Sequence, residues 1–305
     1  MTTRDRTLAV LVAVCWGLNF PATALALRHY PPLLLVAVRF ALIALPTLVL
    51  VPRPPIPLRW LVGTGLGIGT AQFAFLYLGM AAGMPSGLAS LVLQASAPFT
   101  VVLAGVLLRE RLTGRQVVGV VVAVGGLGLI AAHRAQVAAL LPLLLTLCGA
   151  LGWAVGNVCS RRAQAPNPFH LTLWMSTVPV LPMLALSLVV EGPARIGAAL
   201  GTAFTPAALP ALGGLLYVVV VATLVGYGIW NTMLARYPSS TVAPFSMLVP
   251  VVGVLSSWLL FDEAIDVVEA VAGVLVVGGV LFGSSRSRRR ADPVRREPSL
   301  VRADA

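Results

Sequence analysis

An internal repeat is the feature that most restricts what this chain can fold into. The stretch from Pro85 to Gly126 is written again from Pro238 to Gly279, at a constant offset of 153 residues. Each copy has an apolar run of helix length, a charged break and a second apolar run that carries glycines. The fold must therefore hold two copies of one structural unit.

The charged breaks of the two copies share a signal for the start of a helix. Thr113 stands three residues before Gln116, and Asp266 stands three residues before Glu269. This is the pattern of a capping box, in which each side chain accepts a hydrogen bond from a backbone amide that has no partner inside the helix. We therefore predict that a helix begins at each break.

Composition places the chain in a membrane. Of its 305 residues, 58% are hydrophobic and 10% are charged, whereas soluble proteins carry about 25% charged residues. Apolar runs of roughly 20 residues cross hydrocarbon as helices, because a helix satisfies its own backbone hydrogen bonds where water is absent. We expect an all-α integral membrane protein with ten transmembrane helices, near residues 7–27, 32–51, 60–82, 86–108, 115–132, 137–158, 170–190, 207–234, 240–261 and 267–283.

The arginines predict the orientation of these spans. Apart from Arg39, 17 arginines fall on the side of the N-terminus and three on the other side, so the positive-inside rule places both termini in the cytoplasm. Each half has five spans, an odd number, and the second half therefore enters the membrane inverted relative to the first. We expect residues 7–132 to form the first repeat, residues 137–283 the second, and residues 284–305 a disordered, arginine-rich cytoplasmic tail.

Several classes of function are disfavoured. The net charge of +11 comes from 21 arginines that form no basic stripe within a soluble domain, so we expect no nucleic-acid partner. The three cysteines lack metal-ligand spacing. Capping accounts for Asp266 and Glu269, and exposure to solvent accounts for Asp262 and Glu263. No catalytic motif stands in a suitable setting. We therefore expect no enzyme, no metal site and no other cofactor.

Arg39 is the one formal charge that we place well inside a span. An ionisable residue at this depth is costly and indicates function, and a planar guanidinium matches a carboxylate in two-pronged geometry. We expect Arg39 to attract a substrate carboxylate. The alternative is a side chain that reaches the nearer interface or pairs with backbone carbonyls.

Two prolines predict irregular backbone in the repeated helices. Pro98 lacks the amide that would bond to the carbonyl of Gln94, and Pro250 does the same to Ser246. Free carbonyls at membrane depth are tolerated where they line a cavity or are buried in protein. Gln94 and Ser246 are therefore candidate pocket residues, unless the kinks serve packing alone.

Aromatic and amide side chains recur at matching depths. Trp16 with Asn19 in the first span corresponds to Trp153 with Asn157 in the sixth. Paired across the repeat axis, they would form an aromatic wall with amide hydrogen bonds for a small polar solute; ordinary packing is the alternative. Further candidates of the same chemistry are Tyr77, Tyr227, Trp230 and Asn231.

The architecture favours a carrier, because inverted repeats characterise proteins that alternate access around a site near the membrane midplane. The chain contains no lysine, and so no lysine-bearing phosphate loop for ATP. No Asp or Glu lies deep inside a predicted span, since Glu269 is the third residue of the last one, and this weakens the idea of proton coupling through a membrane carboxylate.

A set of short motifs resembles one family. The motifs are Trp16-Gly-Leu-Asn19-Phe-Pro21, Met84 to Gln94, Glu110-Arg-Leu with Gln116, Val225-Gly-Tyr-Gly-Ile-Trp230 and Leu248-Val-Pro-Val-Val-Gly253. On these motifs the chain resembles the EamA family of the drug/metabolite transporter superfamily over about residues 4–283. The resemblance implies a ten-helix carrier of two EamA repeats that exports small amino-acid metabolites, such as cysteine or O-acetylserine, across a bacterial inner membrane.

We therefore expect two partners, a small-molecule substrate and the lipid bilayer. One rival reading is a carrier of another solute, such as an aromatic amino acid, a sugar conjugate or a drug. The other is a membrane scaffold that transports nothing. The sequence leaves the exact substrate, the energy source and the oligomeric state open.

Overall fold

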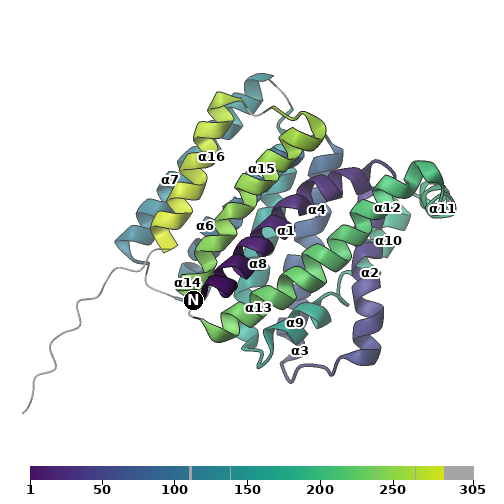
Figure 1. Ribbon diagram of the computed structural model, residues 1–305, viewed down its shortest axis with the longest axis horizontal. Coiled ribbons are helices and arrows are strands. Elements are labelled where there is room, and N and C mark those ends of the chain that lie inside the picture. The colour runs from purple at the N-terminus through teal and green to yellow at the C-terminus, as the bar shows by residue number, and fades with distance from the viewer. Residues whose placement is uncertain (110–111, 138, 238, 265, 285–305) are drawn as a thin grey trace, which may run out of the picture.

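A computed structural model describes residues 1–109, 112–137, 139–237, 239–264 and 266–284 (Figure 1). Over these residues the secondary structure is entirely helical. The predicted all-α membrane fold with ten transmembrane helices is confirmed by ten helical segments that are long and apolar enough to cross a membrane. They are Thr3–Leu27, Pro32–Leu50, Leu58–Ala81, Ser86–Leu107, Gly114–Gln136, Leu141–Ala163, Pro168–Val190, Pro206–Arg236, Pro244–Phe261 and Val267–Ser284.

Five spans are single α-helices and five are interrupted. The single helices are α1 (Thr3–Leu27), α2 (Pro32–Leu50), α7 (Gly114–Val137), α8 (Leu141–Ala163) and α16 (Val267–Ser284). In the first half, the third span consists of α3 (Leu58–Thr64), η1 (Gly65–Ala71) and α4 (Gln72–Ala81), and the fourth of α5 (Ser86–Val92), η2 (Leu93–Ala95) and α6 (Ser96–Leu107). In the second half, the seventh span consists of α9 (Pro168–Met175) and α10 (Val180–Val190), and the eighth of η3 (Pro206–Ala208), α12 (Leu209–Leu216), η4 (Tyr217–Val225) and α13 (Gly226–Arg236). The ninth span consists of α14 (Ser239–Val242), η5 (Ala243–Met247) and α15 (Leu248–Phe261). A further helix, α11 (Pro193–Gly201), follows α10.

Predicted and observed span boundaries differ by four residues or more in the first, fifth, sixth and ninth spans. The first span begins at Thr3 rather than at residue 7, because Thr2 Oγ1 accepts a hydrogen bond of 3.2 Å from the Asp5 amide and starts the helix before the apolar run. The sixth span covers 141–163 rather than 137–158, because α7 continues to Val137. The repeat limits 7–132 and 137–283 stay predictions. The predicted disordered tail, residues 284–305, lies outside the described residues except for Ser284, the last residue of α16.

The helix-start signals are formed in one copy and half formed in the other. The Thr113 amide donates to Gln116 Oε1 at 2.8 Å, and the Gln116 amide donates to Thr113 Oγ1 at 3.3 Å, a complete capping box. Asp266 accepts from the Val268 amide at 2.7 Å. Glu269, however, does not complete the second box, because its carboxylate lies 3.8 Å from the guanidinium of Arg134.

Irregular backbone occurs at corresponding places in the two halves. The third and eighth spans each contain a π-helical segment, η1 and η4. The fourth and ninth spans each contain a 3-10 segment, which ends three residues before Pro98 in one half and three residues before Pro250 in the other. The predicted irregularity at the two prolines is confirmed, and its cause is the missing proline amide.

The packing of the helices follows the repeat. The fifth helices of the two halves, α7 and α16, lie side by side along one edge of the molecule, and α2 lies beside α10 at the opposite edge (Figure 1). The first helix of each half packs on corresponding helices of the other half, α1 on α15 and α12, and α8 on α6 and α4. Exchange of the two halves therefore leaves these pairings of spans unchanged.

Helices approach one another most closely at glycines. This is expected in a membrane, where the hydrophobic effect does not drive helices together and close packing between them does. In the α7 and α16 pair, a Cβ added at Gly279 would lie 2.7 Å from the Gly119 carbonyl oxygen and 2.8 Å from the Ala123 amide. Both of these neighbours are backbone atoms that a rotamer change cannot move. The neighbouring Gly278 is exposed and has nothing within 4 Å of the same position.

We expect Gly279→Ala to destabilise the protein by about 1 to 3 kcal/mol, because the added methyl group would overpack a backbone contact. Gly278→Ala is the matched control and should leave stability unchanged or slightly higher, since it reduces the freedom of the unfolded chain. Thermal unfolding of both variants in the same detergent measures the difference. Equal unfolding temperatures for the two would show that the helices do not pack this closely.

Candidate functional site

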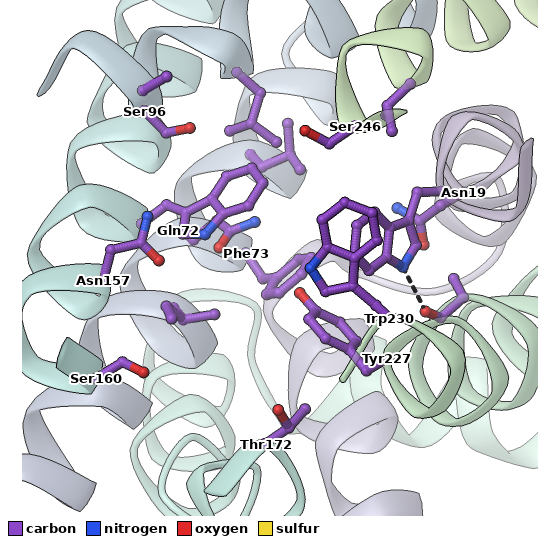
Figure 2. Close-up of a pocket in the computed structure, with 18 of the residues that line it drawn as sticks. Asn19, Gln72, Phe73, Ser96, Asn157, Ser160, Thr172, Tyr227, Trp230 and Ser246 are labelled. Carbon is purple, nitrogen blue, oxygen red and sulfur yellow. Dashed lines mark hydrogen bonds between the residues drawn. The ribbon is translucent and has the colours of Figure 1, made fainter. Parts of the chain in front are cut away.

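A cavity of about 600 Å³ lies between the two halves. Its lining comes from the first four spans of each half, whereas α7 and α16 contribute no lining residue among those described. Amide, hydroxyl and aromatic side chains converge on it (Figure 2). The size and mixed lining are typical of small-molecule sites, which are mostly apolar with a few placed polar groups.

The structure brings ten of the eleven predicted site residues to this cavity. Their role in binding a substrate stays a prediction. They are Trp16, Asn19, Arg39, Gln94, Trp153, Asn157, Tyr227, Trp230, Asn231 and Ser246.

The prediction is wrong for the position of Tyr77, which does not line the cavity. Its side chain is completely buried, and its hydroxyl accepts a hydrogen bond of 2.7 Å from Arg39 Nη1. Tyr77 therefore lies behind the cavity wall and holds the residue that forms it.

Arg39 is buried in the cavity wall and does not reach the interface. Its side chain is 3% exposed, and Nη2 donates to Thr223 Oγ1 at 3.1 Å. The guanidinium carbon lies 3.8 Å from the centre of the Phe73 ring, a cation–π contact. No Asp or Glu among the described residues pairs with it, and its Nε has no partner. The site thus holds a buried positive charge that hydroxyls and a ring satisfy only in part.

The π-helical segment η4 positions two side chains of the site. The Ala222 carbonyl accepts a hydrogen bond of 2.9 Å from Trp16 Nε1, and the next residue, Thr223, accepts from Arg39. Thr223 Oγ1 in turn donates to the Val218 carbonyl at 2.8 Å. Because a π-helix shifts the backbone pairing by one residue, it re-aims carbonyls that an α-helix would use internally, and such segments are frequent at functional sites.

Three rings form a cluster at one side of the cavity. The centre of the Trp16 ring lies 5.0 Å from that of Tyr227 and 5.1 Å from that of Trp230. Figure 2 shows Asn19, Tyr227 and Trp230 at the same side of the cavity, with Asn157 and Ser160 at the other side. Trp153 also lines the cavity, and no ring contact joins it to Trp16 in the described chain, so the aromatic wall predicted from these two stays a prediction. We call Trp16, Tyr227 and Trp230 the aromatic cluster.

Several polar atoms around the cavity are buried and have no partner. They are Asn19 Oδ1, Asn231 Nδ2 and Gln72 Oε1. Asn157 is satisfied by contrast, since its Nδ2 donates to Thr100 Oγ1 at 3.2 Å. Buried polar groups are nearly always hydrogen-bonded, so the unpartnered atoms indicate places that water or a ligand fills.

Gln72 and Phe73 line the cavity and were missed from the sequence. A signal existed for Gln72, because a carboxamide inside an apolar run is as unusual there as Gln94 is in the next span. No signal existed for lining hydroxyls such as that of Thr172, which bonds to the Pro168 carbonyl of its own helix at 3.0 Å. Serine and threonine commonly do this in helices that line nothing.

The cavity reaches the face on which the N-terminus lies. Pro168 is the first residue of α9 and Leu234 lies two residues before the end of α13, and both are lining residues at that face. At the opposite face, which we call the distal face, no described lining residue belongs to the outermost four residues of a span. The cavity is therefore continuous with one face of the molecule only.

Carboxylates of the second half join the first half at the distal face. Glu263 accepts hydrogen bonds from Ser86 Oγ at 3.1 Å and from the Gly87 amide at 3.0 Å, at the start of α5. Glu191 accepts from the Leu33 and Leu34 amides at 2.7 and 2.9 Å, at the start of α2. An anion at a helix N-terminus satisfies free amides and complements the helix dipole. The expectation that solvent alone explains Glu263 is wrong.

Metal ligands do not gather anywhere in the described parts of the chain, where no group of three His, Cys, Asp or Glu side chains could share an ion. The chemistry of the cavity is thus that of binding by one guanidinium, several amides and aromatic rings.

Comparison with known proteins places these features in context. The model of the EamA-like transporter family matches residues 6–132 and 140–285. The chain is 41% identical over 286 residues to a probable amino-acid metabolite efflux pump of Escherichia coli strain K12, covering 92% of this chain and 94% of that protein. The corresponding protein of Salmonella typhimurium is also 41% identical, over 300 residues, with 95% and 99% covered.

More distant relatives share the full length. A probable terminal-alkyne amino-acid exporter of Streptantibioticus cattleyicolor is 26% identical, with 92% of this chain and 94% of that protein covered. A solved crystal structure of 21% identity superposes with a TM-score of 0.60 over 92% of this chain and 96% of its own. At that identity the likeness concerns the fold alone.

The contact of Glu263 with α5 leads to a matched pair of variants. Glu263→Gln should raise the rate of hydrogen exchange of the amides in 86–92 about five- to tenfold, because the charged hydrogen bonds to Ser86 and Gly87 become neutral ones. Asp262→Asn removes the same charge one residue away and should leave that rate unchanged. Exchange followed by mass spectrometry on the purified protein measures both. Equal effects of the two variants would mean that net charge, and not the cap on α5, decides the stability of this face.

Proposed function

The chain belongs to the EamA-like transporter family, and on that basis we propose that it exports small amino-acid metabolites of the cysteine and O-acetylserine kind. It is a transporter rather than an enzyme and has ten apolar helices for a multi-pass membrane position. The direction of transport rests on the relatives, which carry the names efflux pump and exporter.

The proposed substrate class rests on one observation, which is the position of the Arg39 guanidinium in the cavity wall. It is buried, it has no carboxylate partner among the described residues, and its Nε is unpartnered. A carboxylate of the substrate would complete the pairing of this charge by two parallel hydrogen bonds, which Arg forms more readily than Lys. An amino acid always supplies such a group. A cavity of about 600 Å³ accommodates a small one.

The proposed mechanism is alternating access. The cavity is continuous with the N-terminal face, and Glu263 and Glu191 join the halves at the distal face. In a carrier of two inverted halves, the opposite state arises when one half rocks against the other around the site between them. The hydrogen bonds of Glu263 and Glu191 to α5 and α2 would then have to break, and water would replace the carboxylates at both helix ends.

We place the protein in the inner membrane with both termini in the cytoplasm. The arginine count, 17 against three, supports this orientation. The face that the cavity reaches would then be the cytoplasmic one, where an exporter takes up its substrate.

The transport proposal is tested by counterflow of labelled cysteine in proteoliposomes. We expect the wild type to exchange cysteine, and Arg39→Lys to weaken the apparent affinity about ten- to a hundredfold, because the fork of two charged hydrogen bonds is lost while the charge is kept. Arg53→Lys makes the same substitution at an exposed position and is the control.

Absence of cysteine flux in the wild type would contradict the proposed substrate. A thermal-shift panel of aromatic amino acids, sugar conjugates and drugs would then identify a carrier of another solute, and a scaffold would respond to none. Repeating the flux with and without a pH gradient distinguishes proton coupling from simple exchange.

The orientation predicts that reporters fused to the N-terminus and to the C-terminus both report from the cytoplasm. Ten crossings return the chain to the face from which it started. Reporters on opposite faces would contradict the ten-span arrangement, and two reporters outside the cytoplasm would contradict the orientation alone.

A further inference from the structure

The described lining of the cavity offers a positive charge for the carboxylate of an amino acid but no negative charge for its ammonium group. Arg39 is the one formally charged residue in the described lining, which contains no Asp and no Glu. A substrate carboxylate at Arg39 would bring its own ammonium group into the same dry space. An ammonium ion buried without a partner is costly, so a site for it has to be built from neutral groups.

Aromatic rings are the neutral groups that attract an ammonium ion, because their faces carry negative potential. The Phe73 ring is already used, since the guanidinium of Arg39 lies 3.8 Å from its centre. The aromatic cluster offers three further rings, and the Trp16 ring lies 5.0 Å from that of Tyr227 and 5.1 Å from that of Trp230. Its Trp16 is fixed in orientation by the hydrogen bond to the Ala222 carbonyl, so the cluster is formed before a ligand arrives.

A polar acceptor lies beside these rings. Asn19 Oδ1 is buried and has no hydrogen-bond partner. Asn19 stands three residues after Trp16 on the same face of α1, and Figure 2 shows it at the same side of the cavity as Trp230. An ammonium N–H would satisfy this oxygen.

The distance between the two kinds of group is set by η4. Consecutive residues of this segment bond to the two sides of the site, Ala222 to Trp16 and Thr223 to Arg39. Tyr227 of the cluster follows Thr223 by four residues, one helical turn. An α-amino acid carries its ammonium and carboxylate groups on the same carbon, so a molecule of this size can reach both sides at once.

We propose that the aromatic cluster together with Asn19 binds the ammonium group of the substrate, beside the carboxylate site at Arg39. This inference rests on the proposed export of amino acids and deepens it. The site selects zwitterions and rejects N-acylated amino acids, which keep the carboxylate but carry no positive charge.

The test is the competition of unlabelled cysteine and of N-acetylcysteine against counterflow of labelled cysteine. In the wild type, cysteine should compete at least tenfold better. Trp230→Leu should reduce this preference about tenfold by weakening cysteine alone, because N-acetylcysteine makes no cation–π contact to lose. Trp230→Phe keeps a ring face and should retain most of the preference.

Controls separate this effect from damage to the fold. Trp258→Leu removes a tryptophan that is 52% exposed on α15, outside the cavity, and should change neither flux nor preference. Tyr227→Leu with Tyr227→Phe is a second pair, for the case that Trp230→Leu does not fold, and thermal unfolding of every variant reports its integrity.

The outcomes are distinct. A wild type that prefers N-acetylcysteine, or a Trp230→Leu variant that weakens both competitors equally, would overturn the ammonium site while leaving amino-acid transport in place. A wild type without cysteine flux would overturn the proposed function together with this inference.

Discussion

Burying the guanidinium of Arg39 at the middle of the molecule requires that the surroundings compensate for lost water. Two hydroxyls, of Tyr77 and Thr223, and the face of Phe73 do so, and these groups come from both halves of the chain. The compensation is incomplete, because Nε has no partner and no carboxylate among the described residues is near. Because the described residues supply no anionic partner for this charge, the site is suited to bind an anionic group of a ligand.

The backbone around this charge is irregular for a reason that the membrane supplies. In hydrocarbon every carbonyl needs a partner, so irregular segments survive where they are buried in protein or line a cavity. The segments η1 and η4 occupy corresponding places in the two halves, yet η4 alone holds both Trp16 and Arg39. The two halves share a fold, and their side chains give the cavity two different sides.

The same asymmetry holds along the membrane normal. The cavity reaches the N-terminal face, while carboxylates of the second half cap helices of the first half at the distal face. Each of these carboxylates bonds to amides that an α-helix leaves free, and water could satisfy the same amides if the proposed alternating-access movement separated the two halves.

Ten spans, their inverted repetition and the depth of Arg39 follow from the sequence, because hydropathy, helix caps and spacing act within one segment. The same holds for most of the candidate cavity residues, since amides and tryptophans inside apolar runs are conspicuous. Only the tertiary structure decided that Tyr77 lies behind Arg39, that Trp16 joins Tyr227 and Trp230 rather than Trp153, and that Glu263 caps α5. These contacts join residues that are far apart in the chain. Which residues meet depends on the rotation and crossing of the helices, and close packing at glycines determines both. A local sequence pattern contains no information about this packing.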